Sequence, residues 1–538
     1  MRRESLARSG GLSLFGSAFA ALSALALTAL IGNGFGPAGT GVFLQAVAVF
    51  TVVSQVLRLG SNSSIIRFIS AQRALVGIDD SWRISLLAIV PVAVIATGVG
   101  ILMAVFASPL GHFLAPAENA AELARIIASM APFVVVGAVL SVLQTITRMV
   151  RGVGAFTLLQ SILLPLSRLA VAIAVLTLAL GADTAFFGWM AVLPLWLVVT
   201  VAVVVQPLNR DRIAAGAVNP RDRTSMSEFF SFSAPRAVGA SLETALDWSD
   251  VLVVAALTTP AQAGVYAVAT RAVRAGQIVD RAMRIAVSPT ISKLLAQRKL
   301  DDARRLHTAV TRFMILASWP FYLTLAVMGP AVLSLFGDGF EDGWIVLALL
   351  SGAMMVSSAA GMLQSVLLQG GRSSWQMYNK AVVLVVNVGL NLFLVPLLGI
   401  TGAAISWVVS LSVDTTLAAW QVHRGMGVRL EPRSLLGATV LPLLVFGVGN
   451  AVVRLIAGAT LPGLLIGLPV LVILYAGLVW LLRTRLGIDS VLDRFLPARF
   501  TRIFAGRVFA SRVPARHGRG AKQQSERPSE PAPTAGDR

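Results

Sequence analysis

Five ionisable side chains occur close together in a part of the sequence that is otherwise apolar. The acids Glu243, Asp247 and Asp250 are spaced by four and then three positions, so a helix would place them on one face. Arg271 and Arg274 follow, three positions apart, and would also share a helix face. Carboxylates can take up protons or cations, and the guanidinium fork matches phosphate oxygens. The pattern therefore indicates a site for an anionic headgroup, for a coupling ion, or for both.

Long apolar segments must position these charges. The chain has 538 residues, of which 56% are hydrophobic and 13% are charged, and its mean hydropathy is +0.80. No water-soluble fold of this length can bury so much apolar surface. Apolar runs of roughly twenty residues, the length that crosses a bilayer, recur along the chain. The sequence therefore predicts an all-α polytopic membrane protein with these charges at membrane depth, where they are costly.

The apolar runs predict about fourteen transmembrane helices. Their approximate bounds are 11–32, 41–58, 85–107, 127–149, 155–179, 185–206, 231–257, 263–288, 307–329, 344–369, 377–398, 402–422, 434–456 and 463–483. The turn TTPAQAG makes the seventh and eighth spans antiparallel neighbours. At about 1.5 Å per residue, Asp250 lies about 12 Å and Arg271 about 15 Å below this turn. Acids and arginines could therefore pair if the two charged faces meet.

Lysine and arginine concentrate in alternate loops. Arg210, Arg212, Arg221 and Arg223 follow the sixth span, whereas the turns NGFGPAGTG and LGADT carry no basic residue. By the positive-inside rule both termini are cytoplasmic, and the expected location is the bacterial cytoplasmic membrane. The net charge of +19 thus reflects orientation, because no basic segment with interleaved aromatics indicates nucleic acid. The absence of cysteine and the four scattered histidines predict no metal site, and no cofactor is expected.

Two pairs of similar motifs indicate an internal repeat. PAGTGVF at 37–43 is similar to PAQAGVY at 260–266, and LGADTAFFGW at 180–189 is similar to LGITGAAISW at 398–407. The two offsets differ by only a few residues, which predicts two pseudo-symmetric six-helix lobes of one topology around a central cavity. The predicted divisions are an N-terminal lobe at 1–206, a cytoplasmic linker at 207–230, a C-terminal lobe at 231–422, two extra transmembrane helices at 423–483, and a basic, mostly disordered cytoplasmic tail at 484–538.

Several short motifs keep a characteristic order across roughly residues 10–425. G-V-F at 41–43 and G-V-Y at 264–266 open the second and eighth spans, LFGDGF precedes the tenth, and LGITGAAIS precedes the twelfth. In this the chain resembles the polysaccharide transporter family of the multidrug/oligosaccharidyl-lipid/polysaccharide exporter superfamily. The resemblance implies two six-helix bundles around a cavity that opens alternately to either side. It also implies flipping of undecaprenyl-pyrophosphate-linked oligosaccharide, a cell-surface polysaccharide precursor.

Arginines at mid-depth would lower the cost of moving a pyrophosphate headgroup across the hydrocarbon core. The candidate headgroup ligands are Arg271, Arg274 and, near the middle of the fifth span, Arg168. The structural alternative is that these arginines are paired locally with acids, or extend toward the membrane surface, and bind no substrate.

The remaining polar groups of the spans fall into three sets. Candidates for charge pairing, or for coupling to H⁺ or Na⁺, are Glu243, Asp247, Asp250 and, in the twelfth span, Asp414. Arg236 and Lys380 lie near the cytoplasmic ends, where they could attract the headgroup as it enters or could anchor their helices. Asn387 and Asn391 share one face of the eleventh span, which favours hydrogen bonds between helices.

These features favour a lipid-linked oligosaccharide flippase whose partners are its substrate, membrane lipids, H⁺ or Na⁺, and polysaccharide assembly proteins. One alternative is a cation-coupled multidrug or metabolite exporter, in which Asp247 or Glu243 would carry the ion. A second is a lipid II flippase, which the two extra spans favour, and a remote one is a membrane glycosyltransferase. The chain has no GxxxxGK[ST] motif and no outer loop long enough for a catalytic domain, so no enzyme is predicted.

Overall fold

A computed structural model of the protein describes residues 2–75, 81–214, 224–370, 372–426 and 435–484. Within these ranges every regular element is a helix. A helix satisfies its backbone hydrogen bonds internally, which an apolar segment in lipid requires. The predicted all-α membrane fold is confirmed.

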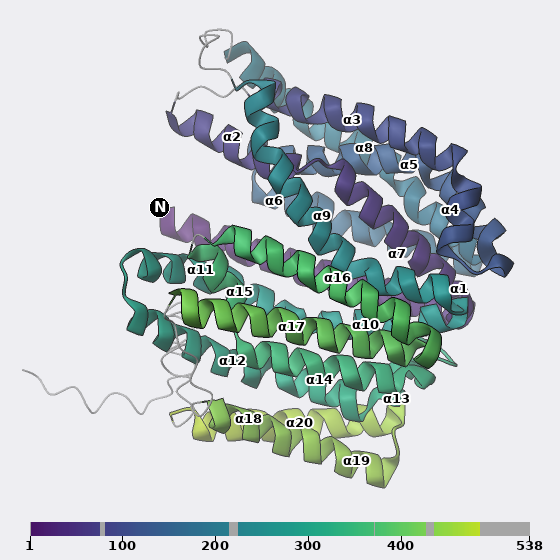
Figure 1. The fold of residues 1–538 in the computed structure, drawn as a ribbon, viewed down its shortest axis with the longest axis vertical. Coiled ribbons are helices and arrows are strands. Elements are labelled where there is room, and N and C mark those ends of the chain that lie inside the picture. Colours follow the sequence, from purple (N-terminus) through teal and green to yellow (C-terminus); the bar gives the residue numbers. More distant parts are fainter. Residues whose placement is uncertain (1, 76–80, 215–223, 371, 427–434, 485–538) are drawn as a thin grey trace, which may run out of the picture. The chain divides into compact units, whose positions relative to one another are not determined.

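The first half of the chain forms one group of packed helices (Figure 1). Its elements are α1 (Arg2–Leu57), α2 (Ser61–Leu75), α3 (Ser81–Val105), α4 (Ala107–Leu114), α5 (Ala117–Val150), α6 (Val153–Phe156), the π-helix η1 (Thr157–Leu163), α7 (Leu164–Thr177) and α8 (Ala182–Ala214). Helix α1 is interrupted at Gly36, which has a φ of 64° and precedes Pro37. It therefore covers the first two predicted spans as two helical segments that meet at this break.

The second half forms another group, in which α12 packs against α14 and α16 packs against α17 (Figure 1). Its elements are α9 (Met226–Leu257), α10 (Pro260–Ala275), α11 (Gln277–Ala296), α12 (Leu300–Val327), α13 (Gly329–Leu333), the short 3₁₀ helices η4 (Ser334–Phe336) and η5 (Glu341–Gly343), α14 (Trp344–Ala360), α15 (Leu363–Gln369), α16 (Ser373–Leu398) and α17 (Ile400–Met426). Helix α1 contacts both α9 and α10, and so joins the two groups.

The last described helices pack on the outside of the second group. They are α18 (Leu436–Pro442), the π-helix η7 (Leu443–Val448), α19 (Gly449–Ala457) and α20 (Leu461–Leu482). The segment from α18 to α19 contacts α12, and α20 contacts α13. These elements occupy the positions of the two extra spans predicted beyond the second lobe.

Eleven helical stretches of the described residues are long and apolar enough to cross a membrane. The first, Gly11–Gln72, contains two predicted spans, whereas α9, α10 and α11 do not qualify. Helix α10 has only 16 residues and carries two arginines. A multi-pass membrane fold follows from these stretches, but a count of fourteen spans is not confirmed.

The described helices also bear on the predicted domain divisions. Helix α8 ends at Ala214 and α9 begins at Met226, so helices extend from both sides into the predicted linker at 207–230. Of the predicted tail at 484–538, everything after residue 484 lies outside the described residues.

The two motifs of the internal repeat contact each other. A Cβ atom on Gly41 would collide with the backbone carbonyl of Pro260, and one on Gly264 would collide with that of Pro37. Each motif thus supplies a proline carbonyl and, four residues later, the glycine that lets the other backbone approach. Small residues allow such close helix contacts in membranes. The reciprocal contact explains why glycine stands at the same position of both motifs.

Replacing Gly41 or Gly264 with alanine is expected to lower the free energy of unfolding by about 1–3 kcal/mol. The added methyl group meets a backbone carbonyl that cannot rotate away, which is the situation of an overpacked core. The midpoint of thermal unfolding in detergent measures the effect. Gly98→Ala in α3 is the matched control, because no atom lies within 4 Å of its added Cβ. Midpoints equal to that of Gly98→Ala would contradict the prediction.

Candidate functional site

The three acids of α9 lie in different surroundings although they share one helical face. Glu243 and Asp247 are exposed, whereas Asp250 is only 1% exposed. Helix α9 packs against α1, α10 and α16, and Asp250 lies toward its C-terminal end, where α10 follows. Asp250 is therefore the acid whose charge interacts most strongly with its protein surroundings.

Both arginines of α10 contact neutral groups. Nη1 of Arg271 donates a hydrogen bond of 2.8 Å to Oγ1 of Thr28 on α1, and its guanidinium lies 5.6 Å from the centre of the Trp248 ring. Nη2 of Arg274 donates to the backbone carbonyl of Asp247. No ion pair joins either arginine to Glu243, Asp247 or Asp250 in the described structure. Arg271 therefore keeps donors and positive charge for an anionic ligand, whereas the charge of Arg274 also acts on the buried carboxylate of Asp250.

The carboxylate of Asp250 belongs to a buried polar cluster between α9 and α16. Nδ2 of Asn391 donates to Oδ1 of Asp250 at 2.8 Å and to Oδ1 of Asn387 at 3.2 Å. The hydroxyl of Ser249 donates to the same Asn387 oxygen at 3.0 Å. The predicted hydrogen bonds of Asn387 and Asn391 between helices are confirmed.

Three buried oxygens of this region have no hydrogen-bond partner among the described residues. They are Oδ2 of Asp250, Oδ1 of Asn391 and the hydroxyl of Tyr266. The Tyr266 hydroxyl comes from α10 and faces the Asp250 carboxyl closely enough to interact with it, and the buried Nδ2 of Asn387 is an unpartnered donor in the same cluster. Buried polar atoms are almost always satisfied, so a set of unsatisfied oxygens needs an explanation. Carboxylate, amide and hydroxyl oxygens are ligands for hard cations, and a carboxylate can also accept a proton. The cluster is thus suited to a small cation or a proton.

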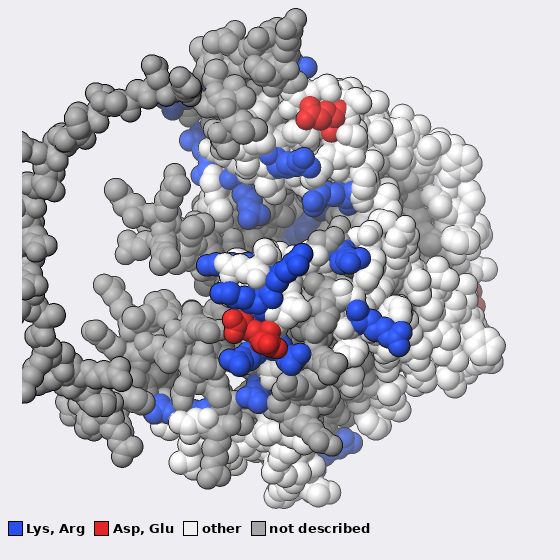
Figure 2. Space-filling view, turned by 60° about the vertical axis from the view of Figure 1, so that its left-hand side comes forward, with Lys and Arg blue, Asp and Glu red and all other residues white. Residues whose placement is uncertain are grey.

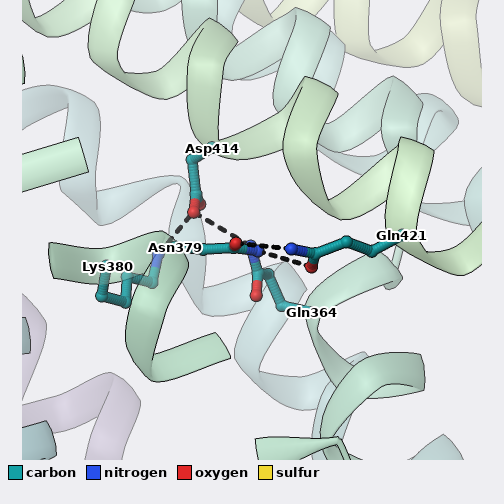
Figure 3. A network of polar contacts seen from close by, with 5 residues as sticks. All are labelled: Gln364, Asn379, Lys380, Asp414 and Gln421. Carbon is teal, nitrogen blue, oxygen red and sulfur yellow. Dashed lines mark hydrogen bonds and ion pairs between the residues drawn. The ribbon is translucent and has the colours of Figure 1, made fainter. Parts of the chain in front are cut away.

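A second polar network connects α15, α16 and α17 (Figure 3). Nζ of Lys380 lies 2.9 Å from Oδ2 of Asp414, and Nε2 of Gln364 donates to Oδ1 of the same carboxylate at 3.1 Å. Asn379 and Gln421 exchange two amide hydrogen bonds of 2.8 and 2.7 Å beside this pair. The side chain of Lys380 is 18% exposed and that of Asp414 is 8% exposed. Asp414 thus connects three separate elements.

Arg168 lies in the first group of helices. Its guanidinium is 3.6 Å from the centre of the Trp189 ring, so it stacks on an aromatic residue of α8. Trp189 itself is buried and packs against Phe50 and Phe186. No contact among the described residues joins Arg168 to Arg271 or Arg274. Its place in a headgroup site therefore stays a prediction.

Basic residues gather on one face of the molecule. Figure 2 shows the side that is on the left in Figure 1, where Lys and Arg greatly outnumber Asp and Glu. The exposed residues Arg67 and Arg236 belong to helices that approach this side. The assignment of this face to the cytoplasmic side stays a prediction.

Comparison with known proteins identifies the family of the chain. Residues 7–295 match a family described as polysaccharide biosynthesis protein, and this region is more than half of the chain. The chain belongs to this family. The predicted resemblance to polysaccharide transporters is thereby confirmed at the level of the family.

Two curated relatives come from Haloferax volcanii. The probable low-salt glycan biosynthesis flippase Agl15 is 21% identical over 229 residues, which are 42% of this chain and 48% of the relative. The probable flippase AglR is 24% identical over 194 residues, which are 36% of this chain and 40% of the relative. The chain thus spans less than half the length of each of these relatives.

Solved structures share the fold of this family member. The lipid II flippase MurJ, in an inward closed conformation, aligns with a TM-score of 0.60 at 12% identity, covering 87% of this chain and 98% of MurJ. An inward-facing multidrug transporter of the MATE family also aligns with a TM-score of 0.60, at 17% identity, covering 76% of this chain and 95% of the transporter. At these identities the likeness establishes the fold alone.

The sequence did not point to several residues that contact the candidate groups. Thr28, Trp248, Tyr266 and Gln364 approach the charges from other helices. Residues of these kinds occur throughout the chain, so their identity alone does not indicate a site. The spacing of residues along one helix also does not predict which residues of another helix will contact them. The sequence analysis predicted separate roles for Lys380 and Asp414. Their ion pair was not predicted, because the two residues lie on different helices.

Proposed function

We propose that this protein is a flippase that moves undecaprenyl-pyrophosphate-linked oligosaccharide, a cell-surface polysaccharide precursor, across the bacterial cytoplasmic membrane. The observation that carries the proposal is Arg271, which lies within an apolar helical bundle and has no acidic partner among the described residues. Such a charge is costly unless a ligand uses it. The family match and the two relatives named as probable flippases support the same function.

A diphosphate headgroup can use the two arginines of α10 in a definite way. Arg271 donates to Thr28 through one nitrogen, and its remaining donors can form a fork to phosphate oxygens. Arg274 lies about one turn after Arg271 on α10 and donates to the backbone carbonyl of Asp247 on α9. The bond from Arg271 to Thr28 also joins α10 to α1, so a movement that separates these helices would free the guanidinium. Substrate binding and alternating access would thereby be coupled at one residue.

The buried cluster around Asp250 is the proposed site of the coupling ion. Its residues come from α9, α10 and α16. Helix α9 also carries Asp247, and α10 also carries both arginines. Binding of H⁺ or Na⁺ would satisfy its unpartnered oxygens and neutralise the carboxylate. Because α10 carries both Tyr266 and Arg271, occupation of this site would alter the helix that holds the headgroup.

Purified protein in liposomes tests the proposed transport. An undecaprenyl-pyrophosphate-linked oligosaccharide labelled on its sugar is placed in both leaflets, and a membrane-impermeant glycosidase reports the share of headgroups on the outside. Protein-containing vesicles should make nearly all of the headgroups accessible, and empty vesicles about half. A parallel series with lipid II as the substrate tests the alternative that the protein is a lipid II flippase. No difference between empty and protein-containing vesicles would refute the flippase function.

Ion gradients imposed on the same vesicles test the coupling site. Transport should respond to either a Na⁺ gradient or a pH gradient, and Asp250→Ala should abolish that response. Glu228→Gln is the matched control, because Glu228 is an exposed acid in the first turn of the same helix. A gradient response that persists in Asp250→Ala would exclude Asp250 as the ion ligand.

A cation-coupled drug exporter is the second candidate. The exposed carboxylates of Glu243 and Asp247 favour it, since they could attract a cationic compound. Arg271 opposes it, because this arginine has no acidic partner among the described residues and would repel a cationic drug. Uptake of ethidium into inverted vesicles distinguishes the two functions: an exporter accumulates the dye, and a lipid-linked oligosaccharide flippase does not.

A further inference from the structure

Two arginines from different helices lie against the same phenylalanine ring. The guanidinium carbon of Arg67 on α2 is 4.0 Å from the centre of the Phe232 ring, and that of Arg236 on α9 is 4.7 Å from it. The two carbons are therefore at most 8.7 Å apart. Both arginines are exposed. No acid in the described part of the chain forms an ion pair with either of them.

The crossing of α2 and α9 holds these arginines together. The hydroxyls of Ser64 and Ser233, both fully buried, share a hydrogen bond of 2.5 Å between the two helices. Gly60, just before α2, lies so close to the backbone of Ser233 that a Cβ atom would not fit. Phe68 packs edge-on against Phe232, with ring centres 6.0 Å apart. These contacts thus fix the crossing from which the two arginine side chains project.

This arginine pair lies far from the turn between α9 and α10. Arg236 precedes the end of α9 at Leu257 by 21 residues, or about 32 Å of helix. Arg271 follows the start of α10 at Pro260 by 11 residues, or about 17 Å. The pair is therefore about 15 Å nearer than Arg271 to the opposite end of the bundle, where Lys and Arg gather (Figure 2). It also joins a helix of the first half to a helix of the second.

Two positive charges within 8.7 Å of each other attract an anion that can contact both of them. Stacking on an aromatic ring orients each guanidinium and leaves its planar fork available for hydrogen bonds. A group with several phosphate oxygens can accept from both forks at once. A single carboxylate offers fewer acceptor oxygens, so a diphosphate is the better match.

We propose that Arg67, Phe232 and Arg236 form a site for the diphosphate of a lipid-linked glycan, separate from Arg271 and reached before it. This inference rests on the proposed flippase function and adds the residues at which the headgroup first binds. The first-bound headgroup would contact α2 and α9 together, and then move about 15 Å along the bundle to the arginines of α10.

Titration of the purified full-length protein with undecaprenyl diphosphate in detergent, followed by native mass spectrometry, tests the site. Phosphatidylglycerol and inorganic pyrophosphate are titrated separately to distinguish a general lipid phosphate or a free anion from the polyprenyl diphosphate. Arg67→Ala and Arg236→Ala should each weaken diphosphate binding about tenfold, since each removes charge-assisted hydrogen bonds. Arg67→Lys should restore only part of the affinity, because lysine lacks the fork. Arg305→Ala, at an exposed arginine of α12, is the matched control.

The outcomes separate this inference from the flippase proposal. Unchanged diphosphate affinity in both alanine variants would overturn the site and leave the flippase function standing. Equal losses for phosphatidylglycerol or pyrophosphate would overturn its assignment to the lipid-linked diphosphate. Weakened binding in these variants, with wild-type affinity in Arg305→Ala, supports the site. Failure of the wild-type protein to move the labelled lipid would refute the flippase function itself, whatever the binding data show.

Discussion

Arg271→Ala is expected to lower the initial rate of headgroup translocation in liposomes by about 100-fold. Arg271 is fixed between α10 and α1 by its hydrogen bond to Thr28, and it has no acidic partner among the described residues. A hydrogen bond to a charged group contributes about 1.5–3 kcal/mol. Each 1.36 kcal/mol or so corresponds to a tenfold change in rate. Loss of one to two such bonds in the transport transition state gives the expected factor.

Three further variants define the cause of this loss. Arg271→Lys keeps the charge but not the fork, so an intermediate rate is expected. Thr28→Ala removes the group that orients Arg271 and should reduce the rate by only a few-fold. Arg281→Ala, at an exposed arginine of α11, should transport as the wild type does. If Arg271→Ala transports at the wild-type rate, the arginines of α10 do not bind the headgroup.

Lys380→Ala is expected to lower the free energy of unfolding by about 3 kcal/mol. The substitution leaves the Asp414 carboxylate, only 8% exposed, without the ammonium group that lies 2.9 Å away. Removing one partner of a buried ion pair typically costs about 3–5 kcal/mol, and the partial exposure of Lys380 places the effect at the lower end. Unfolding in detergent, followed by tryptophan fluorescence, measures the change.

The double variant Lys380→Gln/Asp414→Asn tests whether the pair is structural or functional. It removes both charges and keeps a hydrogen-bond acceptor for Gln364, so most of the lost stability should return. If Asp414 couples transport to an ion, this stable variant will transport without responding to a gradient. If the pair only holds α15, α16 and α17 together, the gradient response will remain. A double variant less stable than Lys380→Ala would show that the charges themselves stabilise the fold.

The acids of α9 show how far spacing along a sequence can be interpreted. The interval between Glu243, Asp247 and Asp250 predicts a shared helical face, and the structure does place all three on one helix. The spacing alone does not reveal that only Asp250 is buried, because burial depends on which helices pack there. The arginines of α10 show the same limit, since similar depths allowed pairing with the acids but did not determine their contacts.

The membrane character, the helical class and the internal repeat were determined by the sequence alone. Hydropathy and helical periodicity are local properties, and the Pro and Gly positions shared by 37–41 and 260–264 reflect a contact that both halves must make. The tertiary structure alone decided which charges are buried and what they contact. Asp250 and Asn391 are 141 residues apart, and Arg271 and Thr28 are 243 apart. Helix packing brings such distant residues together, and no spacing within one helix encodes it.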